Sequence, residues 1–163
     1  MNNCIFCKII SRETNSEIIY EDEKTVAVLD VAPRSLGHSM VLPKVHAENI
    51  LNLPDKEIEG VFKAVKKVAG ILEKTFKPDG FTIGINHGKA SGQVVDHLHI
   101  HIIPRWHGDA GGSIHSVVNP ARDRSPRGGR SRAFGGAVSN GVNNPTEESL
   151  EEIGKRIRSS SEN

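Results

Sequence analysis

The chain has 163 residues, with 21 lysines and arginines against 20 aspartates and glutamates and a formal net charge of +1. This length allows one domain with a real hydrophobic core and is short for two. The near balance of charge disfavours a dedicated nucleic-acid binder, and no apolar stretch approaches the roughly 18 residues of a membrane span. Since the first residues carry no basic or long apolar leader, we expect a cytoplasmic protein.

The only two cysteines, Cys4 and Cys7, form a Cys-x-x-Cys motif near the N-terminus. A secreted disulfide framework would need more cysteines at wider spacing, and a thioredoxin-like redox pair should open a helix within a βαβ unit. Both interpretations are therefore weak. The third interpretation is half of a zinc site, for which His46 and His97 are candidates for the other two ligands.

Three short β-rich runs follow a helical turn that we expect after the cysteines. The runs are residues 17–20, 25–29 and 39–42. An acidic turn separates the first two, which predicts a hairpin, and Pro33 and Gly37 place a loop before the third.

A long amphipathic helix is predicted from about residue 55. Pro54 stands in its first turn, where a missing N–H has no cost, and the Pro-Asp-Gly sequence at residues 78–80 ends it. The apolar residues at helical spacing are Ile58, Val61, Phe62, Val65, Val68, Ala69 and Leu72. We interpret Lys63, Lys66 and Lys67 as a solvated face of this helix rather than a phosphate site.

A strand is predicted at residues 81–86, and after a glycine-rich turn comes a strand in which histidines alternate with branched apolar residues. Because side chains alternate between the faces of a strand, His97, His99 and His101 project from one face. A buried imidazole needs partners for its ring nitrogens, so three on one face indicate a site. The spacing alone leaves both metal binding and histidine catalysis open.

The composition changes after about residue 116. The arginines of this region are interleaved with serine, glycine and proline: Arg122, Arg124, Arg127, Arg130 and Arg132. We interpret residues 119–145 as a surface segment, either a solvated loop or a contact for polyphosphate or nucleic acid. Residues 146–163 are predicted to form a C-terminal helix and tail, with Leu150, Ile153 and Ile157 as its apolar stripe.

The segment His97-Leu98-His99-Ile100-His101-Ile102-Ile103 resembles the signature of the histidine triad (HIT) superfamily. The other segments that resemble the family, in family order, are residues 4–9, 26–33, 37–46, 85–88 and 92–93. The resemblance implies a HIT domain over residues 1–118 that pairs into homodimers with a continuous sheet. It also implies an α+β fold with a mostly antiparallel sheet and one long helix, which the order of the predicted elements fits independently.

The resemblance further implies a structural zinc ion. In some bacterial and archaeal members, a Cys-x-x-Cys motif, the histidine of a Pro-Lys-x-His segment and the first triad histidine hold zinc. Those positions match Cys4, Cys7, His46 and His97. Such a site has four protein ligands and no open position, and it would tie the N-terminus to the sheet.

In the HIT family the middle histidine attacks the α-phosphorus of a nucleotide and forms a covalent intermediate, which implies His99 as the nucleophile. A nucleophilic imidazole must be neutral and held in one tautomer, and a backbone carbonyl is the expected partner of its other nitrogen. The resemblance implies that His101 contacts the phosphate and assists proton movement. His38 matches a fourth family histidine that lines the same pocket.

The nucleotide-binding residues are also implied by the match. Asp30 follows an apolar strand, so its carboxylate can accept both ribose hydroxyls; the alternative is an aspartate that only caps a turn. Asn86, Gly92 and Gln93 match residues near the family's phosphate site, where glycine permits close approach of backbone N–H groups.

The leaving group is less constrained. The phosphoramidase branch has a hydroxyl residue three positions before the first triad histidine, where this chain has Val94. The ending His-Ile-Ile-Pro-Arg resembles dinucleoside polyphosphate hydrolases, and His101 argues against the nucleotidylyltransferase branch, which has glutamine there. We expect a hydrolase of phosphoramidate or acyl-nucleotide derivatives that releases a purine mononucleotide such as AMP. The alternatives are a dinucleoside polyphosphate hydrolase and a zinc-stabilised nucleotide-binding interaction module.

Overall fold

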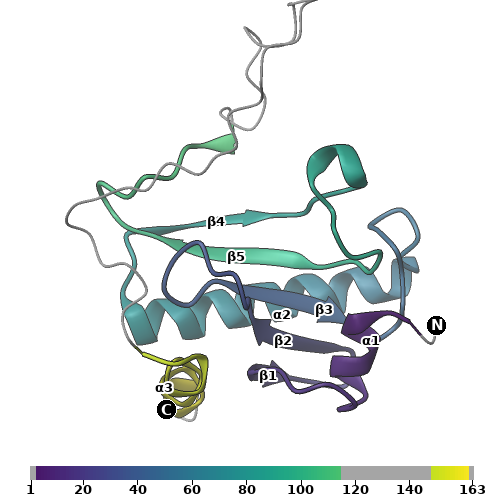
Figure 1. The fold of residues 1–163 in the computed structure, drawn as a ribbon, viewed down its shortest axis with the longest axis horizontal. Helices are drawn as coiled ribbons and strands as arrows, with labels where there is room; N and C mark the ends of the chain where they lie inside the picture. Colours follow the sequence, from purple (N-terminus) through teal and green to yellow (C-terminus); the bar gives the residue numbers. More distant parts are fainter. Residues whose placement is uncertain (1–2, 115–147, 162–163) are drawn as a thin grey trace, which may run out of the picture.

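The computed structural model describes residues 3–114 and 148–161, and its centre is a five-stranded antiparallel sheet (Figure 1). The strands are β1 (Ile18–Glu21), β2 (Thr25–Leu29), β3 (Ser39–Pro43), β4 (Gly80–Gly84) and β5 (Ile100–Arg105), in the spatial order β1-β2-β3-β5-β4. The helices are α1 (Ile5–Ile10), α2 (Asp55–Phe76) and α3 (Leu150–Ser161), with a 3₁₀ turn, η1, at Lys89–Ser91. The predicted α+β class is confirmed. The arginine-rich segment lies outside the described residues.

The predicted hairpin of β1 and β2 is present, and an aspartate shapes its turn. Asp22 Oδ1 accepts hydrogen bonds from the backbone N–H groups of Lys24 and Thr25, at 2.9 and 2.7 Å, and from the Thr25 hydroxyl at 2.9 Å. A short acidic side chain that binds the main chain two and three residues ahead is a common way to close a turn.

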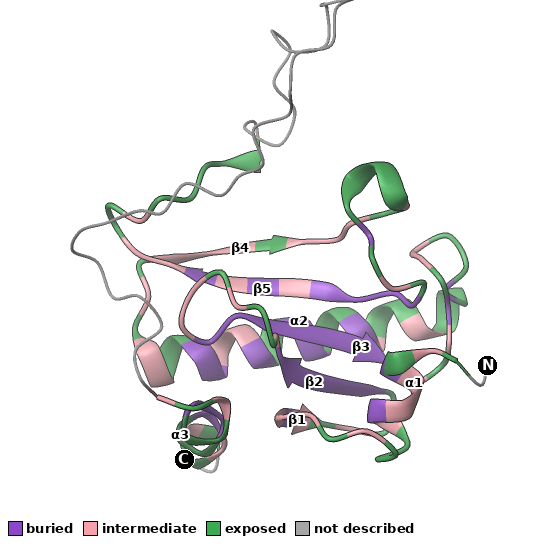
Figure 2. Cartoon of the chain, in the orientation of Figure 1, coloured by how far each residue is buried: buried purple, intermediate pink, exposed green. Residues whose placement is uncertain are grey.

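Helix α2 packs against one face of the sheet and buries a stripe of its own apolar residues (Figure 2). The buried stripe is Val61, Ala64, Val65, Val68, Ile71 and Leu72. It is rotated relative to the predicted face, because Ile58 and Phe62 are 36% and 47% exposed. Lys63, Lys66 and Lys67 are exposed, as expected for a solvated face. The helix ends at a left-handed Lys77, whose N–H donates to the Glu73 carbonyl.

The two faces of the sheet bury two separate apolar clusters. Leu98, Ile100 and Ile102 belong to the larger one, under α2. The opposite face is covered by α1, which contributes Phe6 and Ile9 to a smaller cluster with residues of β2 and β3. The histidines therefore lie on the α1 side, as the alternation predicts.

The hydrogen-bonded part of β5 begins only at Ile100, so the predicted strand starts too early. His97 and His99 lie in the extended segment before it, where the Leu98 N–H donates to the Ala47 carbonyl at 2.6 Å. This segment pairs with the loop that carries His46 instead of continuing the sheet. The difference matters because it brings the loop around residue 46 to the triad.

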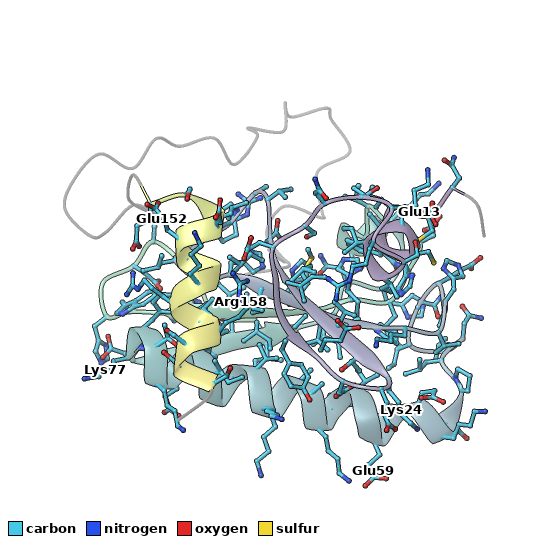
Figure 3. All side chains as sticks on the ribbon, turned by 90° about the horizontal axis from the view of Figure 1, so that it is seen from below. Glu13, Lys24, Glu59, Lys77, Glu152 and Arg158 are labelled. Atoms are coloured by element: carbon cyan, nitrogen blue, oxygen red, sulfur yellow. The ribbon has the colours of Figure 1, made fainter. Side chains whose placement is uncertain are left out.

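Helix α3 crosses the C-terminal end of α2 and lies beside β1 (Figures 1 and 3). Ile153 and Ile157 are buried in the larger cluster. Arg158 binds the Glu17 carboxylate and donates to the Ile18 carbonyl at 2.8 Å. None of the helices within the described residues is long and apolar enough to cross a membrane.

Candidate functional site

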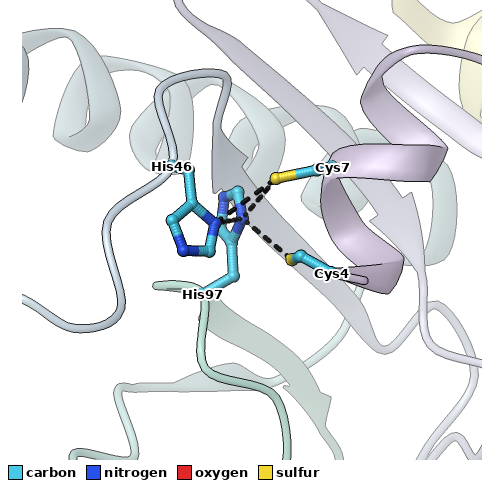
Figure 4. Close-up of side chains that lie close together, drawn as sticks. All are labelled: Cys4, Cys7, His46 and His97. Carbon is cyan, nitrogen blue, oxygen red and sulfur yellow. Dashed lines mark hydrogen bonds between the residues drawn. The ribbon is translucent and has the colours of Figure 1, made fainter. Parts of the chain in front are cut away.

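The four predicted metal ligands come together at the N-terminal edge of the molecule, although they are up to 93 positions apart in the sequence (Figure 4). Their ligand atoms all lie within 4.8 Å of one another. Cys4 and Cys7 come from the start of α1, His46 from the loop after β3, and His97 from the segment before β5.

The distances within this set fit a tetrahedral ion. His97 Nδ1 lies 3.5 Å from each cysteine Sγ and 3.2 Å from His46 Nδ1, and Cys7 Sγ lies 3.3 Å from His46 Nδ1. Zinc bonds of about 2.3 Å to sulfur and about 2.0 Å to nitrogen set tetrahedral edges of about 3.5 Å between sulfur and nitrogen and about 3.3 Å between nitrogens. The donor set and its spacing are therefore those of a zinc-sized ion with no open position.

His97 is prepared for this role by its other ring nitrogen. Its Nε2 donates to the Pro43 carbonyl at 2.9 Å, so the Nδ1 lone pair faces the cysteines. The side chain is fully buried, and this burial lowers its pKa below the ordinary value, which favours the neutral imidazole that binds metals.

His99 occupies the position of the predicted nucleophile and is held in one tautomer. Its Nδ1 donates to the His97 carbonyl at 2.7 Å, so its Nε2 carries the free lone pair. The ring is 6% exposed and meets the edge of Phe6, with 5.2 Å between the ring centroids. The expected backbone carbonyl partner is thus in place.

His101 and His38 form a directed pair beside His99. The Arg34 N–H donates to His38 Nδ1 at 3.2 Å, so a neutral His38 carries its proton on Nε2, and this nitrogen lies 3.0 Å from His101 Nδ1. His38 therefore donates to His101, and the remaining proton of a neutral His101 is on Nε2. The rings of His99 and His101 are perpendicular, with centroids 5.0 Å apart.

Burial keeps this pair uncharged in the free protein. Desolvation, with His38 and His99 as neighbours, lowers the pKa of His101 to about 4. Burial also lowers the pKa of His38, although the Asp30 carboxylate opposes that shift. Both side chains are therefore neutral at pH 7.

One carboxylate oxygen of Asp30 stabilises a turn, and the other faces the histidine pair. Its Oδ1 accepts the Ala32 N–H at 2.9 Å, and its Oδ2 lies 3.6 Å from His38 Nε2 and 3.9 Å from His101 Nδ1. These three side chains also have the spacing of a cation site. The Arg34 N–H argues against one, because it requires the lone pair on His38 Nδ1 and thus a proton on the nitrogen that would bind the ion.

The predicted phosphate loop is held by Gln93. Its Oε1 accepts the Gly88 N–H at 2.7 Å, and its Nε2 donates to the Glu48 and Val95 carbonyls at 2.6 and 3.0 Å. The amide of Gln93 is thus bound to the protein's own backbone, which gives it a shaping role in the loop.

Asn86 and Gly92 lie together at the same loop. Gly92 has a φ of +91°, and a Cβ built on it would stand 3.7 Å from Asn86 Nδ2. Asn86 comes two residues after Gly84, whose register partner is His101. The loop therefore lies next to the triad segment along the sheet.

Sequence reasoning did not identify Phe6 or Arg34, and it noted Gly37 only as a turn residue. The position of Phe6 between the two cysteines could have suggested that it lies near the site. No sequence pattern predicts the hydrogen bond from the Arg34 N–H to His38. Gly37 has a φ of +77°, and a Cβ on it would stand 2.7 Å from the Phe76 ring. Only glycine fits there, directly before His38.

A family model, several relatives and several solved structures match this chain. The family model described as HIT domain matches residues 11–108. An uncharacterised HIT-like protein of Methanocaldococcus jannaschii is 47% identical over 106 residues, which are 65% of this chain and 81% of the relative. An adenylylsulfatase of Arabidopsis thaliana is 38% identical over 64% of this chain and 53% of its own length. An adenosine 5′-monophosphoramidase of Candida albicans is 36% identical over 63% of this chain and 70% of its own length.

Solved structures are also similar to this chain. A HIT-like protein of Bartonella henselae has a TM-score of 0.71 at 32% identity and covers 98% of both chains. A zinc-bound histidine triad family protein of Mycobacterium smegmatis has a TM-score of 0.72 at 28% identity, over 99% of this chain and 94% of that one. On the family match, the relatives and the fold, this chain belongs to the HIT family.

Proposed function

We propose that this chain is a nucleotide hydrolase that acts at the α-phosphate of nucleoside 5′-monophosphate derivatives and releases a mononucleotide such as AMP. The observation that carries the proposal is the hydrogen bond from His99 Nδ1 to the His97 carbonyl. It leaves the Nε2 lone pair of His99 free to attack phosphorus, which a histidine with only a structural role would not need.

In the first step, His99 Nε2 bonds to the α-phosphorus, and the bond from phosphorus to the leaving group breaks with its electron pair on the leaving group. The bound phosphate anion favours the imidazolium form of His101, in which Nδ1 also carries a proton; the N–H groups of His38 and His101 then both turn to Asp30 Oδ2, which lies 3.6 and 3.9 Å from these nitrogens. His101 gives its Nε2 proton to the leaving group. In the second step, water loses a proton to His101 as its oxygen attacks phosphorus, and His99 is released. One water is consumed, and one mononucleotide and one protonated leaving group are formed.

The nucleoside half is assigned to the neighbouring polar groups. Asp30 accepts the ribose hydroxyls, since it stands at the end of β2 beside the histidine pair. Asn86 and Gly92 line the phosphate, and Gln93 holds their loop in shape. His38 directs the tautomer of His101.

The ion of the Cys4, Cys7, His46 and His97 site is zinc in this proposal. Two thiolates and two imidazoles in a tetrahedral arrangement are a donor set that zinc prefers. A zinc-bound relative with the same fold supports the assignment. When bound, zinc cross-links α1 to the sheet and takes no part in the chemistry at phosphorus.

Phosphoramidates and acyl-nucleotides are the favoured substrate class. The monophosphoramidase relative is named for a phosphoramidate, and the adenylylsulfatase relative for adenylyl sulfate, another derivative of a nucleoside 5′-monophosphate. For the alternative, dinucleoside polyphosphates, the sequence offers the resemblance of the ending at Arg105 to segments of that branch. However, Arg105 donates to the Asp109 carboxylate at 2.6 and 2.5 Å and to Thr82 Oγ1 at 2.9 Å, so its charge is already paired.

A second copy of the chain is proposed to pair at β4. This strand is the sheet edge opposite β1, and Ile83 on it is 46% exposed. Phe62, on helix α2, is also 47% exposed. Within the described residues, β4 is an outer strand that carries an exposed apolar side chain, which suits continuation of the sheet across two subunits.

The proposal is tested by chromatographic detection of AMP after incubation with adenosine phosphoramidate and, in parallel, diadenosine tetraphosphate. His99→Ala is the blank and should abolish turnover while nucleotide affinity, measured by calorimetry, stays nearly intact. AMP from the phosphoramidate alone supports the lead proposal, and AMP with ATP from the dinucleotide supports the alternative. Turnover by His99→Ala would refute the nucleophile assignment, and no AMP from either compound would favour a nucleotide-binding interaction module.

A further inference from the structure

The metal-ligand set and the candidate nucleophile share one residue. His97 directs its side-chain Nδ1 toward Cys4, Cys7 and His46, and its backbone carbonyl accepts the hydrogen bond of His99 Nδ1 at 2.7 Å. The same residue therefore carries a metal ligand on its side chain and the orienting group of the nucleophile on its main chain. A movement of His97 would change both.

A second connection runs through α1. Phe6 stands between the two cysteines, and its buried ring lies edge-on to His97 and His99, with centroid distances of 5.9 and 5.2 Å. Helix α1 has only six residues, and within the described chain no side-chain hydrogen bond caps its start at Cys4. Such a short helix is unstable by itself, so its position depends on packing and on the two cysteines.

We propose that the four metal ligands position His99 as well as fasten the N-terminus. With the ion bound, His97 and Phe6 hold His99 as the Nδ1–H tautomer with Nε2 free. Without it, α1 and the segment around residue 97 relax, and the His99 ring populates both tautomers. The inference rests on the proposed function for the role of His99 as nucleophile and for the effect on kcat, whereas the tautomer of His99 is measurable without substrate.

The histidine pair and Asp30 are held by contacts that do not involve these ligands. The hydrogen bonds of His38, from Arg34 and to His101, lie between the β2–β3 loop and β5. Asp30 is fixed by the Ala32 N–H in the same loop. Loss of the ion should therefore lower kcat, which depends on the orientation of His99, far more than it changes KM.

The test compares the full-length chain loaded with zinc, stripped by a chelator, and reloaded with Zn²⁺ or Cd²⁺. Long-range ¹H–¹⁵N spectra report each histidine tautomer. We expect a single Nδ1–H form of His99 when either ion is bound and averaged ¹⁵N shifts after stripping, while His101 keeps its tautomer. In hydrolysis assays, kcat should fall on the order of tenfold to a hundredfold on stripping and return with both ions.

Two variants separate positioning from general stability. Phe6→Leu keeps the metal ligands and an apolar side chain but removes the ring edge, so it should keep its zinc, loosen the His99 ring and lower kcat. Ile9→Ala weakens the same apolar cluster through a side chain that is neither a metal ligand nor an aromatic neighbour of the triad. This control should lower the melting temperature and leave kcat and the His99 tautomer unchanged.

A single Nδ1–H form of His99 in stripped protein, with kcat unchanged, would overturn the inference. So would an equal loss of kcat in Ile9→Ala and Phe6→Leu, a comparison that uses only zinc-loaded protein and holds even if stripping unfolds the chain. A metal-dependent His99 tautomer in a protein that hydrolyses neither test compound would support the inference while refuting the proposed function.

Discussion

At the scale of single residues, the site works through tautomers that backbone groups assign. The Pro43 carbonyl, the His97 carbonyl and the Arg34 N–H each contact one ring nitrogen of a different histidine. Each contact determines what the other ring nitrogen can do. In the proposed function, one histidine is thereby suited to metal binding, one to attack on phosphorus and one to donation within a pair.

The depressed pKa of His101 makes stability depend on pH. Its pKa is about 4 in the folded chain against an ordinary 6.5, so below pH 6.5 the unfolded chain binds a proton that the folded chain does not. The contribution of His101 to the free energy of unfolding is therefore greatest above about pH 6.5, decreases as the pH drops toward 4 and is constant at lower pH. Between pH 7 and 4.5, protonation of His101 in the unfolded chain should lower the free energy of unfolding by about 2–3 kcal/mol.

Urea denaturation of the wild type and of His101→Gln at both pH values checks this. Acid also weakens the metal site, but it does so in both proteins, so the difference between them isolates His101. The variant should lose less stability on acidification than the wild type. Equal losses would show that His101 titrates normally in the folded chain.

The carboxylate of Asp30 should distinguish ribose from its dideoxy analogue. A hydrogen bond to a charged group is worth about 1.5–3 kcal/mol, so Asp30→Ala should weaken AMP binding by roughly tenfold to a hundredfold. Binding of 2′,3′-dideoxy-AMP should change much less, which controls for the contact between Asp30 and the histidine pair. Calorimetry with both nucleotides measures the effect. If Asp30→Ala weakened the binding of AMP and of 2′,3′-dideoxy-AMP equally, Asp30 would not bind the ribose hydroxyls and would have a role in the turn only.

At the scale of elements, the sheet was predictable and the pairing of its loops was not. Alternating apolar residues placed Leu98, Ile100 and Ile102 in the core and the histidines on the other face, because strand periodicity is local. The segment before β5 does not pair within the sheet; instead, the Leu98 N–H donates to the Ala47 carbonyl. This pairing depends on tertiary structure, so local periodicity could not predict it. Phe6 and the Arg34 N–H were missed for the same reason, since neither belongs to a periodic pattern.

Helix α1 should depend on the metal more than any other element does. Its cluster on the sheet is small, with Phe6 and Ile9 as its buried contributions. Cys4→Ser removes one thiolate, so zinc content should fall and the melting temperature should drop by several degrees, as expected for about 2 kcal/mol in a chain of this size. Metal analysis and calorimetry measure both.

The larger core beneath α2 contains no metal ligand, so the Cys4→Ser variant should still unfold cooperatively. A Lys8→Ser variant, on the same short helix but outside the ligand set, is the matched control and should keep its zinc. Native protein without zinc would refute the metal assignment itself.

At the scale of the whole molecule, the two edges of the sheet differ. Helix α3 lies along β1, where the Arg158 guanidinium donates hydrogen bonds to the Ile18 carbonyl and to the Glu17 carboxylate. No described helix has comparable contacts with the β4 edge. A sheet edge left without cover tends to pair with another chain. This asymmetry explains why one edge rather than the other is proposed to carry a dimer.

A charge on the open edge should separate the subunits. Ile83→Lys places an ammonium group on β4, where two copies would bring like charges together across the paired strands, and such pairs are destabilising. Leu51→Lys is the matched control, because Leu51 is 81% exposed and lies outside the sheet. Light scattering across a concentration series should give a dimer for wild type and control and a monomer for Ile83→Lys. A monomeric wild type, or a dimeric Ile83→Lys, would remove β4 as the contact between copies.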